Sequence, residues 1–434
     1  MTDTRHLKAV RRFAKLVRED VDAHFSLRLW DGSLEPLGRT VVPGLALRIG
    51  SPGVLPSLLH WPTLDRLIRH YANGRIDVEG GSLIDLAEPL ALDKAYRRRF
   101  KKIGRMRALA SIAPLYLARG DHPDASRDFG ADAEGAGRRD GDNKRFIQFH
   151  YDVGNDFYRL FLDPEMQYSC AHFPSWDATL EEAQTFKLDM ICRKLRLKPG
   201  ERMLDIGCGW GGLLCHAVRH YGVIGHGVTL SEEQMAFARE KAEALGIADR
   251  MTLQLVDYRE TQGVFDKIAS VGMYEHIGLE NVPEYFATVR ALLAEDGLFL
   301  NHAISRGAKR KRSRFASRPE QRALQKYIFP GGELDDIGHT LSEMEIARFE
   351  IHDVEALRPH YRRTTRIWCE RLSARREEAE ALVGPETYRI WAAYLAGCSF
   401  AFQRGSARLY QTLAGKSPKG TPPVPPTRHD LYRG

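Results

Sequence analysis

Short hydrophobic runs alternate with longer amphipathic segments over the C-terminal part of this 434-residue chain. The runs are continuous and short, as buried strands are, and the segments between them repeat their apolar positions with helical spacing. Strands that alternate with helices predict an α/β fold with a parallel, doubly wound sheet. The predicted strands are 202–207, 223–230, 251–257, 265–273 and 298–305, and the predicted helices are 211–222, 231–246 and 282–297.

One of these predicted strands ends in polar and charged side chains. The run 265–273 leads directly into Tyr274, Glu275 and His276. Burial of a carboxylate is costly unless it is paired. Either these residues begin a helix, where an acid near the positive end is favourable, or they belong to a catalytic site. Ligands of doubly wound sheets lie at the carboxyl ends of the strands, which is where this segment falls.

The chain divides into four predicted regions. Residues 1–120 alternate short strands and helices and form a smaller α+β domain. Residues 121–145 are rich in Gly, Asp, Arg and Ala and are predicted to be a flexible linker. Residues 146–415 hold the α/β domain, and the Pro-rich tail 416–434 is expected to be disordered.

Composition favours a cytoplasmic protein. No run approaches the roughly 18 uncharged apolar residues of a membrane span, and the N-terminus lacks the apolar core of a secretion signal. The cysteines show no CxxC pair and no metal-ligand spacing, so we expect free thiols and no metal. They are Cys170, Cys192, Cys208, Cys215, Cys369 and Cys398.

The net charge of +7 is clustered in two basic runs, 96–107 and 305–318. Basic runs suggest nucleic acid or anionic lipid. No nucleic-acid-binding motif accompanies them, so nucleic acid is not a predicted partner. The first run continues into the apolar segment 103–118, and cations beside apolar side chains fit a segment that lies on a membrane. We therefore expect peripheral association with the inner face of the membrane.

A glycine-rich loop follows the first strand of the α/β domain, directly after Asp205. Gly207, Gly209 and Gly212 match the GxGxxG dinucleotide fingerprint. Gly207, Gly209 and Gly211 match the GxGxG of methyltransferases that use S-adenosylmethionine (SAM). Both templates place bare backbone against a ligand at a helix N-terminus, so the loop alone does not distinguish them.

The ends of the next two strands favour SAM. A dinucleotide site requires an acid at the end of the second strand, where this chain has Thr229, Ser231 and Gln234. The third strand ends in Asp257 and Tyr258, an acid that can bind an adenine amine and a ring that can stack on the base. The sequence therefore favours SAM over a nicotinamide dinucleotide.

Nine segments in one order resemble the cyclopropane-fatty-acyl-phospholipid synthase family, to which the mycolic acid cyclopropane synthases are related. The N-terminal stretch that ends in 77–86 also resembles the small lipid-associated domain of the longer, phospholipid-acting members. The nine segments are 149–158, 166–173, 204–212, 227–234, 257–259, 270–278, 301–305, 327–334 and 360–368.

The resemblance implies a SAM-dependent methyltransferase domain with an acyl-chain tunnel, which acts on unsaturated phospholipids at the membrane surface. The alkene of a cis double bond would attack the sulfonium methyl, and the carbocation would close to a cyclopropane by losing a proton to a bound bicarbonate. The residues that would hold bicarbonate are Cys170, Glu275, His302, the Ile304 backbone and Tyr361. The residues that would bind SAM are Tyr168, Ser169, Asp205, Gly207, Gly209, Thr229, Gln234, Asp257 and Tyr258.

Several of these residues also have a structural explanation. Cys170 can be a small buried hydrophobe, and no base adjacent in sequence would make it a nucleophile. His302 lies within a predicted strand, where a core histidine is usual, and the motif shifts the balance towards function. For His276 we favour a structural hydrogen bond. Tyr274 stands where the family commonly has Phe.

The sequence leaves several alternatives open. A relative within the same fold can add a methyl or methylene group instead of closing a ring. A non-catalytic lipid-binding protein, a nicotinamide oxidoreductase and an RNA or small-molecule methyltransferase are less favoured. The N-terminal domain contacts either lipid or the second subunit of a homodimer, and the basic insert 309–322 is either a lid over the tunnel or a docking patch for anionic headgroups.

Overall fold

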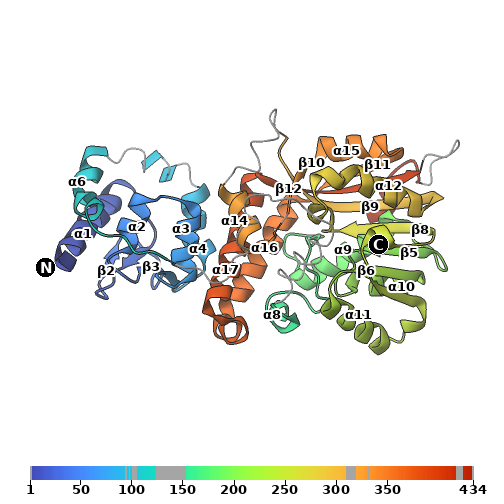
Figure 1. Ribbon diagram of the computed structural model, residues 1–434, viewed down its shortest axis with the longest axis horizontal. Coiled ribbons are helices and arrows are strands. Elements are labelled where there is room, and N and C mark those ends of the chain that lie inside the picture. Colours follow the sequence, from blue (N-terminus) through green and yellow to red (C-terminus); the bar gives the residue numbers. More distant parts are fainter. Residues whose placement is uncertain are drawn as a thin grey trace. The chain divides into compact units, whose positions relative to one another are not determined.

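The chain folds into two compact units, which we call the N-terminal and the C-terminal unit (Figure 1). The N-terminal unit holds residues 1–128, 317–323 and 368–400, and the C-terminal unit holds the remainder. The predicted linker from residue 124 onwards, residues 309–318 of the basic insert and residues 417–423 of the tail lie outside the described residues. The computed structural model describes residues 2–92, 95–96, 98–99, 105–123, 153–308, 319–330, 332–416 and 424–432.

A small mixed sheet and its helices form the first part of the N-terminal unit, as the α+β prediction requires. The strand order is β2-β1-β3-β4, with β1 parallel to β3 and the other pairs antiparallel. Its strands are β1 (Ser26–Arg28), β2 (Leu34–Pro36), β3 (Ala46–Ile49) and β4 (Ile76–Glu79), and its helices are α1 (Thr2–Asp20), α2 (Val54–His60), α3 (Leu64–Ala72), α4 (Leu83–Leu92) and α6 (Arg105–Tyr116).

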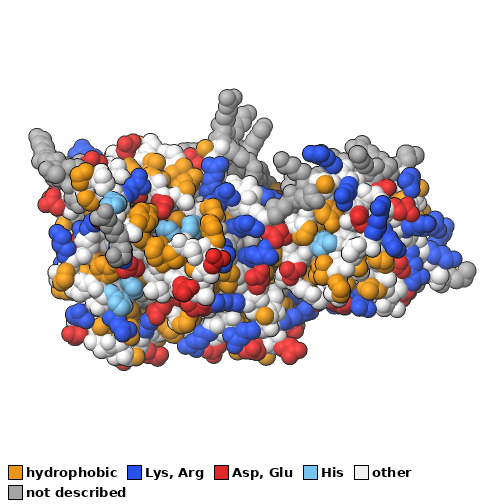
Figure 2. All heavy atoms as spheres, turned by 180° about the vertical axis from the view of Figure 1, so that it is seen from behind, with side chains coloured by type: hydrophobic (Ala, Val, Ile, Leu, Met, Phe, Trp, Pro, Cys, Tyr) orange, Lys and Arg blue, Asp and Glu red, His pale blue; other side chains and the backbone are white. Residues whose placement is uncertain are grey.

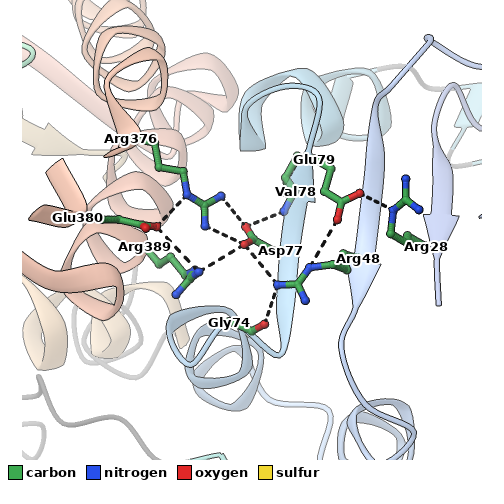
Figure 3. Close-up of polar contacts among 9 residues, drawn as sticks. All are labelled: Arg28, Arg48, Gly74, Asp77, Val78, Glu79, Arg376, Glu380 and Arg389. Atoms are coloured by element: carbon green, nitrogen blue, oxygen red, sulfur yellow. Dashed lines mark hydrogen bonds and ion pairs between the residues drawn. The ribbon is translucent and has the colours of Figure 1, made fainter. Parts of the chain in front are cut away.

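A helical segment far along the chain completes this unit. Asp77 on β4 is buried and pairs with Arg376 at 2.9 Å and Arg389 at 3.4 Å, both on α17 (Arg376–Arg404) (Figure 3). Burial raises the pKa of Asp77, but the hydrogen bond and charge of Arg376 outweigh it and lower the pKa overall. We predicted one domain over 146–415. In the structure, residues 368–400 group with the N-terminal unit, and these ion pairs join α17 to β4.

The C-terminal unit is built on a twisted sheet in the order β11-β12-β9-β8-β5-β6-β7, with β10 paired to β9. Strands β9, β8, β5, β6 and β7 are parallel, whereas β12 runs antiparallel to β9. All five predicted strands are present, and the predicted α/β doubly wound fold is confirmed. The strands are β5 (Arg202–Ile206), β6 (Ile224–Thr229), β7 (Met251–Leu255), β8 (Phe265–Val271), β9 (Leu293–Arg306), β10 (Asp335–Asp336), β11 (Phe349–Ala356) and β12 (Ala407–Lys416).

Helices cover both faces of this sheet, which explains why its central strands are continuous apolar runs. One hydrophobic core lies between the sheet and α12 (Val282–Leu292) and α15 (Ile337–Ile346). The other lies beneath α9 (Leu180–Lys194), α10 (Gly212–Tyr221) and α11 (Glu232–Ala244). The predicted helix 282–297 ends at residue 292, because residues 293–297 already belong to β9. The remaining described α-helices are α8 (Asn155–Arg159), α14 (Pro319–Tyr327) and α16 (Arg358–Ala374).

The expectation of a disordered tail does not hold for residues 424–432. His429–Tyr432 forms a short 3-10 helix, and Leu431 is buried. The carbonyl of Leu431 accepts a hydrogen bond from Arg193, and Arg196 pairs with Asp430. These contacts offset the entropy that a Pro-rich segment loses when it becomes ordered. In the described ranges, no helix has the length and hydropathy of a membrane span.

Candidate active site

A pocket of about 150 Å³ opens at the carboxyl ends of the central strands. Its walls come from the segments that follow β5, β6, β7 and β8, and from the segment that precedes α9. Because parallel strands end at the same edge of a sheet, motifs that are far apart in sequence converge here. All nine residues predicted to bind SAM line this pocket: Tyr168, Ser169, Asp205, Gly207, Gly209, Thr229, Gln234, Asp257 and Tyr258.

The glycine loop brings bare backbone to the pocket. Gly207 has φ of +77°, and a Cβ there would lie 3.0 Å from the Met273 side chain. Gly211 caps α10 with φ of +76°, and a Cβ on it would approach that of Ala238 to 2.9 Å. The loop therefore requires glycine for conformation and for space. It directs the N-terminus of α10, the positive end of the helix, towards the pocket.

Polar side chains follow the second and third strands. Thr229 Oγ1 donates to Gln234 Oε1 at 3.0 Å, and Ser231 caps α11 by accepting from the Gln234 backbone. Asp257 accepts from Arg259 Nε at 2.9 Å, so its carboxylate is already paired. Tyr258 is buried next to it. An aromatic ring, a carboxylate and an amide around bare backbone fit the adenine, ribose and amino-acid groups of SAM.

Lys187 on α9 also lines the pocket, and sequence reasoning missed it. Its ammonium is fully buried and donates to Gln167 Oε1 at 2.6 Å and to Ser169 Oγ at 2.9 Å. Burial lowers the pKa of Lys187 to about 8, although the charges of Asp163 and Asp205 raise it. Burial likewise raises the pKa of Asp205 to about 7, and Lys187 opposes that shift. The lining of the pocket thus holds an amine and a carboxyl group whose charges act on each other's pKa.

The segment that raised the first question is a single 3-10 turn, Tyr274–His276, at the end of β8. Glu275 is 7% exposed, and its Oε1 accepts from the Ile304 backbone N–H at 2.5 Å. Burial raises the pKa of Glu275 to about 7, and the bond from Ile304 lowers it in part. Glu275 Oε2 is buried and has no hydrogen-bond partner among the described residues. His276 lines the same pocket as these residues, and its ring packs against Phe329.

His302 lies on β9, two residues before Ile304, and is 1% exposed. Its Nδ1 is 3.0 Å from Gln411 Nε2 on β12. Its Nε2 is buried and, in the described part of the chain, makes no hydrogen bond. Burial, followed by the charges of Lys187 and Lys194, holds the pKa of His302 well below its usual range. His302 is therefore a neutral imidazole.

Tyr361 lies in the first turn of α16, and Cys170, in the segment before α9, lies near the residue that precedes α16. The Cys170 thiol is fully buried, donates to the Ala171 carbonyl at 3.1 Å and lies 3.9 Å from the Leu357 carbonyl. Burial raises the pKa of this thiol well above its usual range, so it is not a thiolate nucleophile. Tyr361 is one turn after Leu357 and stacks on Phe402.

The five residues assigned to bicarbonate are close to the pocket but do not line it within the described residues. The charge of Lys187 influences the pKa values of Cys170, Asp205 and His302 alike, which relates this buried group to the pocket. The unpaired Glu275 Oε2 can accept a hydrogen bond, and the Nε2–H of a neutral His302 can donate one. Bicarbonate carries one O–H donor and several acceptor oxygens, so these two atoms fit it. Ile304 differs from the expectation in that its N–H is already bonded to Glu275.

This chain is similar to known proteins over most of its length. Residues 139–412 match the family model "Mycolic acid cyclopropane synthetase". A "Probable fatty acid methyltransferase" of Pseudomonas putida is 37% identical over 414 residues, which cover 94% of this chain and 96% of that protein. The cyclopropane-fatty-acyl-phospholipid synthase of Escherichia coli K12 is 40% identical over 264 residues, 61% of this chain and 66% of its own length. A mycolic acid cyclopropane synthase solved with SAH and CTAB has a TM-score of 0.60 at 34% identity, covering 63% of this chain and 98% of its own.

Proposed function

Because the chain belongs to the mycolic acid cyclopropane synthetase family of SAM-dependent methyltransferases, we propose that it adds the SAM methyl carbon to the cis double bond of an unsaturated phospholipid acyl chain and closes a cyclopropane ring. The observation that carries this proposal is the pair of unpartnered buried atoms, Glu275 Oε2 and His302 Nε2, next to a pocket lined by all nine predicted SAM residues. When bound, SAM supplies an electrophilic methyl group.

The residues of the chain would serve this reaction by orientation and by exclusion of water. An isolated alkene is a weak nucleophile, so it must be held in line with the methyl carbon. Bulk water would trap the carbocation as an alcohol. Glu275, His302 and Cys170 are each at most 7% exposed, which keeps this region dry.

A proton must leave the added carbon as the ring closes, and neither His302 nor Cys170 is free to accept it. His302 is a neutral donor, and the Cys170 thiol is protonated. Glu275 and His302 would hold a bicarbonate ion, and the chemistry that this ion would supply is a base for that proton. Its negative charge would also stabilise the carbocation in a site of low dielectric constant.

One relative favours a second candidate product, a methyl-branched or methylene acyl chain. The Pseudomonas putida relative matches 94% of this chain, including the N-terminal unit, and is named a probable fatty acid methyltransferase. The alternative is therefore a C-methyltransferase that gives methyl-branched or methylene acyl chains. Both reactions begin with the same methyl transfer. In the alternative, the carbocation loses its proton so as to leave an alkene, either within the methyl-branched chain or, after a hydride shift, at the added carbon as a methylene group.

We further propose that the N-terminal unit lies against anionic membranes. Large hydrophobic side chains are exposed on or directly after α2 and α6. They are Trp61 after α2 (61%), Leu109 (51%) and Tyr116 (47%) on α6, and Leu117 directly after α6 (92%). His60 Nε2 contacts the Tyr116 carbonyl at 2.7 Å, which joins the two helices. Figure 2 shows Lys and Arg side chains interspersed with hydrophobic ones on this unit. Exposed aromatic and Leu side chains beside cations suit a lipid interface.

The membrane proposal is tested by vesicle flotation of the Trp61→Ser/Leu117→Ser variant. Binding to vesicles that contain phosphatidylglycerol should fall at least fivefold. The matched control is Ile346→Ser, which removes a side chain that is 70% exposed on the C-terminal unit. Equal loss in both variants, or none in either, would refute this interface.

The catalytic proposal is tested with purified protein, SAM labelled in its methyl group and vesicles of dioleoyl phospholipid. The proposal predicts labelled acyl chains that co-elute with cyclopropane standards in gas chromatography. Labelled methyl-branched or methylene chains would select the alternative product. Bound SAM without labelled lipid would refute both.

A further inference from the structure

A buried line of polar side chains ends at His302. Gln411 on β12 stands opposite His302 on β9 in the register of the two strands. Gln411 Nε2 lies 3.0 Å from His302 Nδ1, and Gln411 Oε1 lies 2.5 Å from Lys194 Nζ on α9. Lys194 is paired in turn with Glu355 on β11. Gln411, Lys194 and His302 are each 1% exposed, so water does not compete for these bonds.

The chemistry of these groups fixes every proton in the line. An ammonium group only donates, so the amide oxygen of Gln411 must face Lys194. The amide nitrogen must then face His302, and an amide NH₂ also only donates. His302 Nδ1 must therefore accept, which places the single ring proton of the neutral imidazole on Nε2. The ammonium of Lys194 thus sets both the orientation of the Gln411 amide and the tautomer of the His302 ring.

The same surroundings oppose a second proton on the ring. Lys187 and Lys194 from α9 and His172 from the segment before it are the groups whose charges act on His302, and all three lower its pKa together with burial. On the β12 side the neighbour is the uncharged Gln411. The ring is thus a neutral donor whose Nε2–H has no partner in the described residues.

We propose that Glu355, Lys194 and Gln411 form a relay that holds His302 in the Nε2–H tautomer, so that His302 donates a hydrogen bond to the anion of the site and never acts as the base. This inference rests on the proposed function and adds three positioning residues to it. His302 then cannot accept the proton of the reaction, since the lone pair of its Nδ1 already accepts a hydrogen bond from Gln411.

The relay is tested by NMR of protein labelled with ¹⁵N in its histidines, which reports the protonation of each ring nitrogen. The His302 signal is assigned by its loss in His302→Gln. The wild-type protein should show a neutral ring with the proton on Nε2 between about pH 6 and pH 9. In Gln411→Glu, a carboxylate would accept from both sides, so Nδ1 should become protonated. Gln254→Glu, the same change on the exposed part of β7, is the control and should leave the His302 signal unchanged.

Turnover gives the second measurement. Gln411→Glu should lower turnover at least tenfold at about pH 9, with the dissociation constant of SAM within about twofold, because Gln411 does not line the SAM pocket. If Gln411→Glu fails to fold, the double variant Lys194→Met/Glu355→Gln takes its place, because it removes the ion pair without leaving a lone charge. In that variant the His302 signal should be the average of the two neutral tautomers. A proton on Nδ1 in the wild type, or an unchanged tautomer in these variants, would overturn the relay. The tautomer is measured on resting protein, so this result stands even if no lipid is methylated.

Discussion

Replacement of Glu275 by Gln is expected to stabilise the protein at alkaline pH and to have little effect at acid pH. The amide keeps the acceptor for the Ile304 N–H and resembles the protonated carboxyl in shape. Burial raises the pKa of Glu275 from 4.5 to about 7. The folded state therefore holds this proton more tightly, and the stability that it contributes is fully present below about pH 4.5 and lost as the pH rises through 7.

The difference between these pKa values sets the size of the effect. Relative to a side chain that does not ionise, Glu275 lowers the free energy of unfolding by roughly 3 kcal/mol at about pH 8.5 and by roughly 1 kcal/mol at about pH 5. The melting temperature of Glu275→Gln should thus exceed that of the wild type by several degrees at the higher pH, and the gap should shrink on acidification. Turnover should be largely lost at both values, since the acceptor for the anion is gone.

The assay is differential scanning calorimetry across this pH range in buffers purged of carbon dioxide, so that no bicarbonate binds. Glu243→Gln, on an exposed position of α11, is the matched control and should show no pH-dependent gap. A gap of constant size, or a variant less stable at high pH, would refute the reasoning. Either result would mean that the ionised carboxylate is stabilised in the fold by a donor.

Three further variants probe other parts of the account. Lys187→Met removes the cation that lowers the pKa of Asp205, so Asp205 should stay protonated at neutral pH. Because the cationic SAM then loses a negative neighbour, its dissociation constant, measured by calorimetry, should rise roughly tenfold. Gly211→Ala forces a left-handed conformation on a residue with a Cβ and should lower the free energy of unfolding by about 1–3 kcal/mol. Asp77→Asn should lower the free energy of unfolding by about 1.5–3 kcal/mol at pH values above the lowered pKa of Asp77, and this effect should disappear on acidification. The same variant should speed hydrogen exchange in α17. The control Glu79→Gln should change neither the stability nor the exchange in this way.

The sequence predicted the sheet and the pocket because both depend on local patterns. The strands of the parallel sheet are covered on both faces, so each appears as an apolar run. The pocket residues follow those runs directly, as Asp257 and Tyr258 do, and the carboxyl ends of parallel strands must meet.

The residues that the sequence analysis missed depend on pairings across long separations. Gln411 meets His302 only through the register of β12 and β9, which are 109 residues apart at this pair. Asp77 and Arg376 are 299 residues apart. A signal did exist on α9: Lys187 and Lys194 are seven residues apart on the helix face that also buries Leu188 and Ile191. Charged residues at core positions of a helix indicate a buried polar network.

The most direct test of the central claim is mass spectrometry of the total fatty acids of cells that express the chain and grow on methionine labelled in its methyl group. The account predicts labelled carbon on monounsaturated chains in the wild type, with a mass gain of about 14 for each chain before the label is counted, and none in Glu275→Gln. Chromatography against cyclopropane standards should identify a ring. Unlabelled lipids in cells whose expressed protein still binds SAM would contradict the claim that an unsaturated acyl chain is the acceptor.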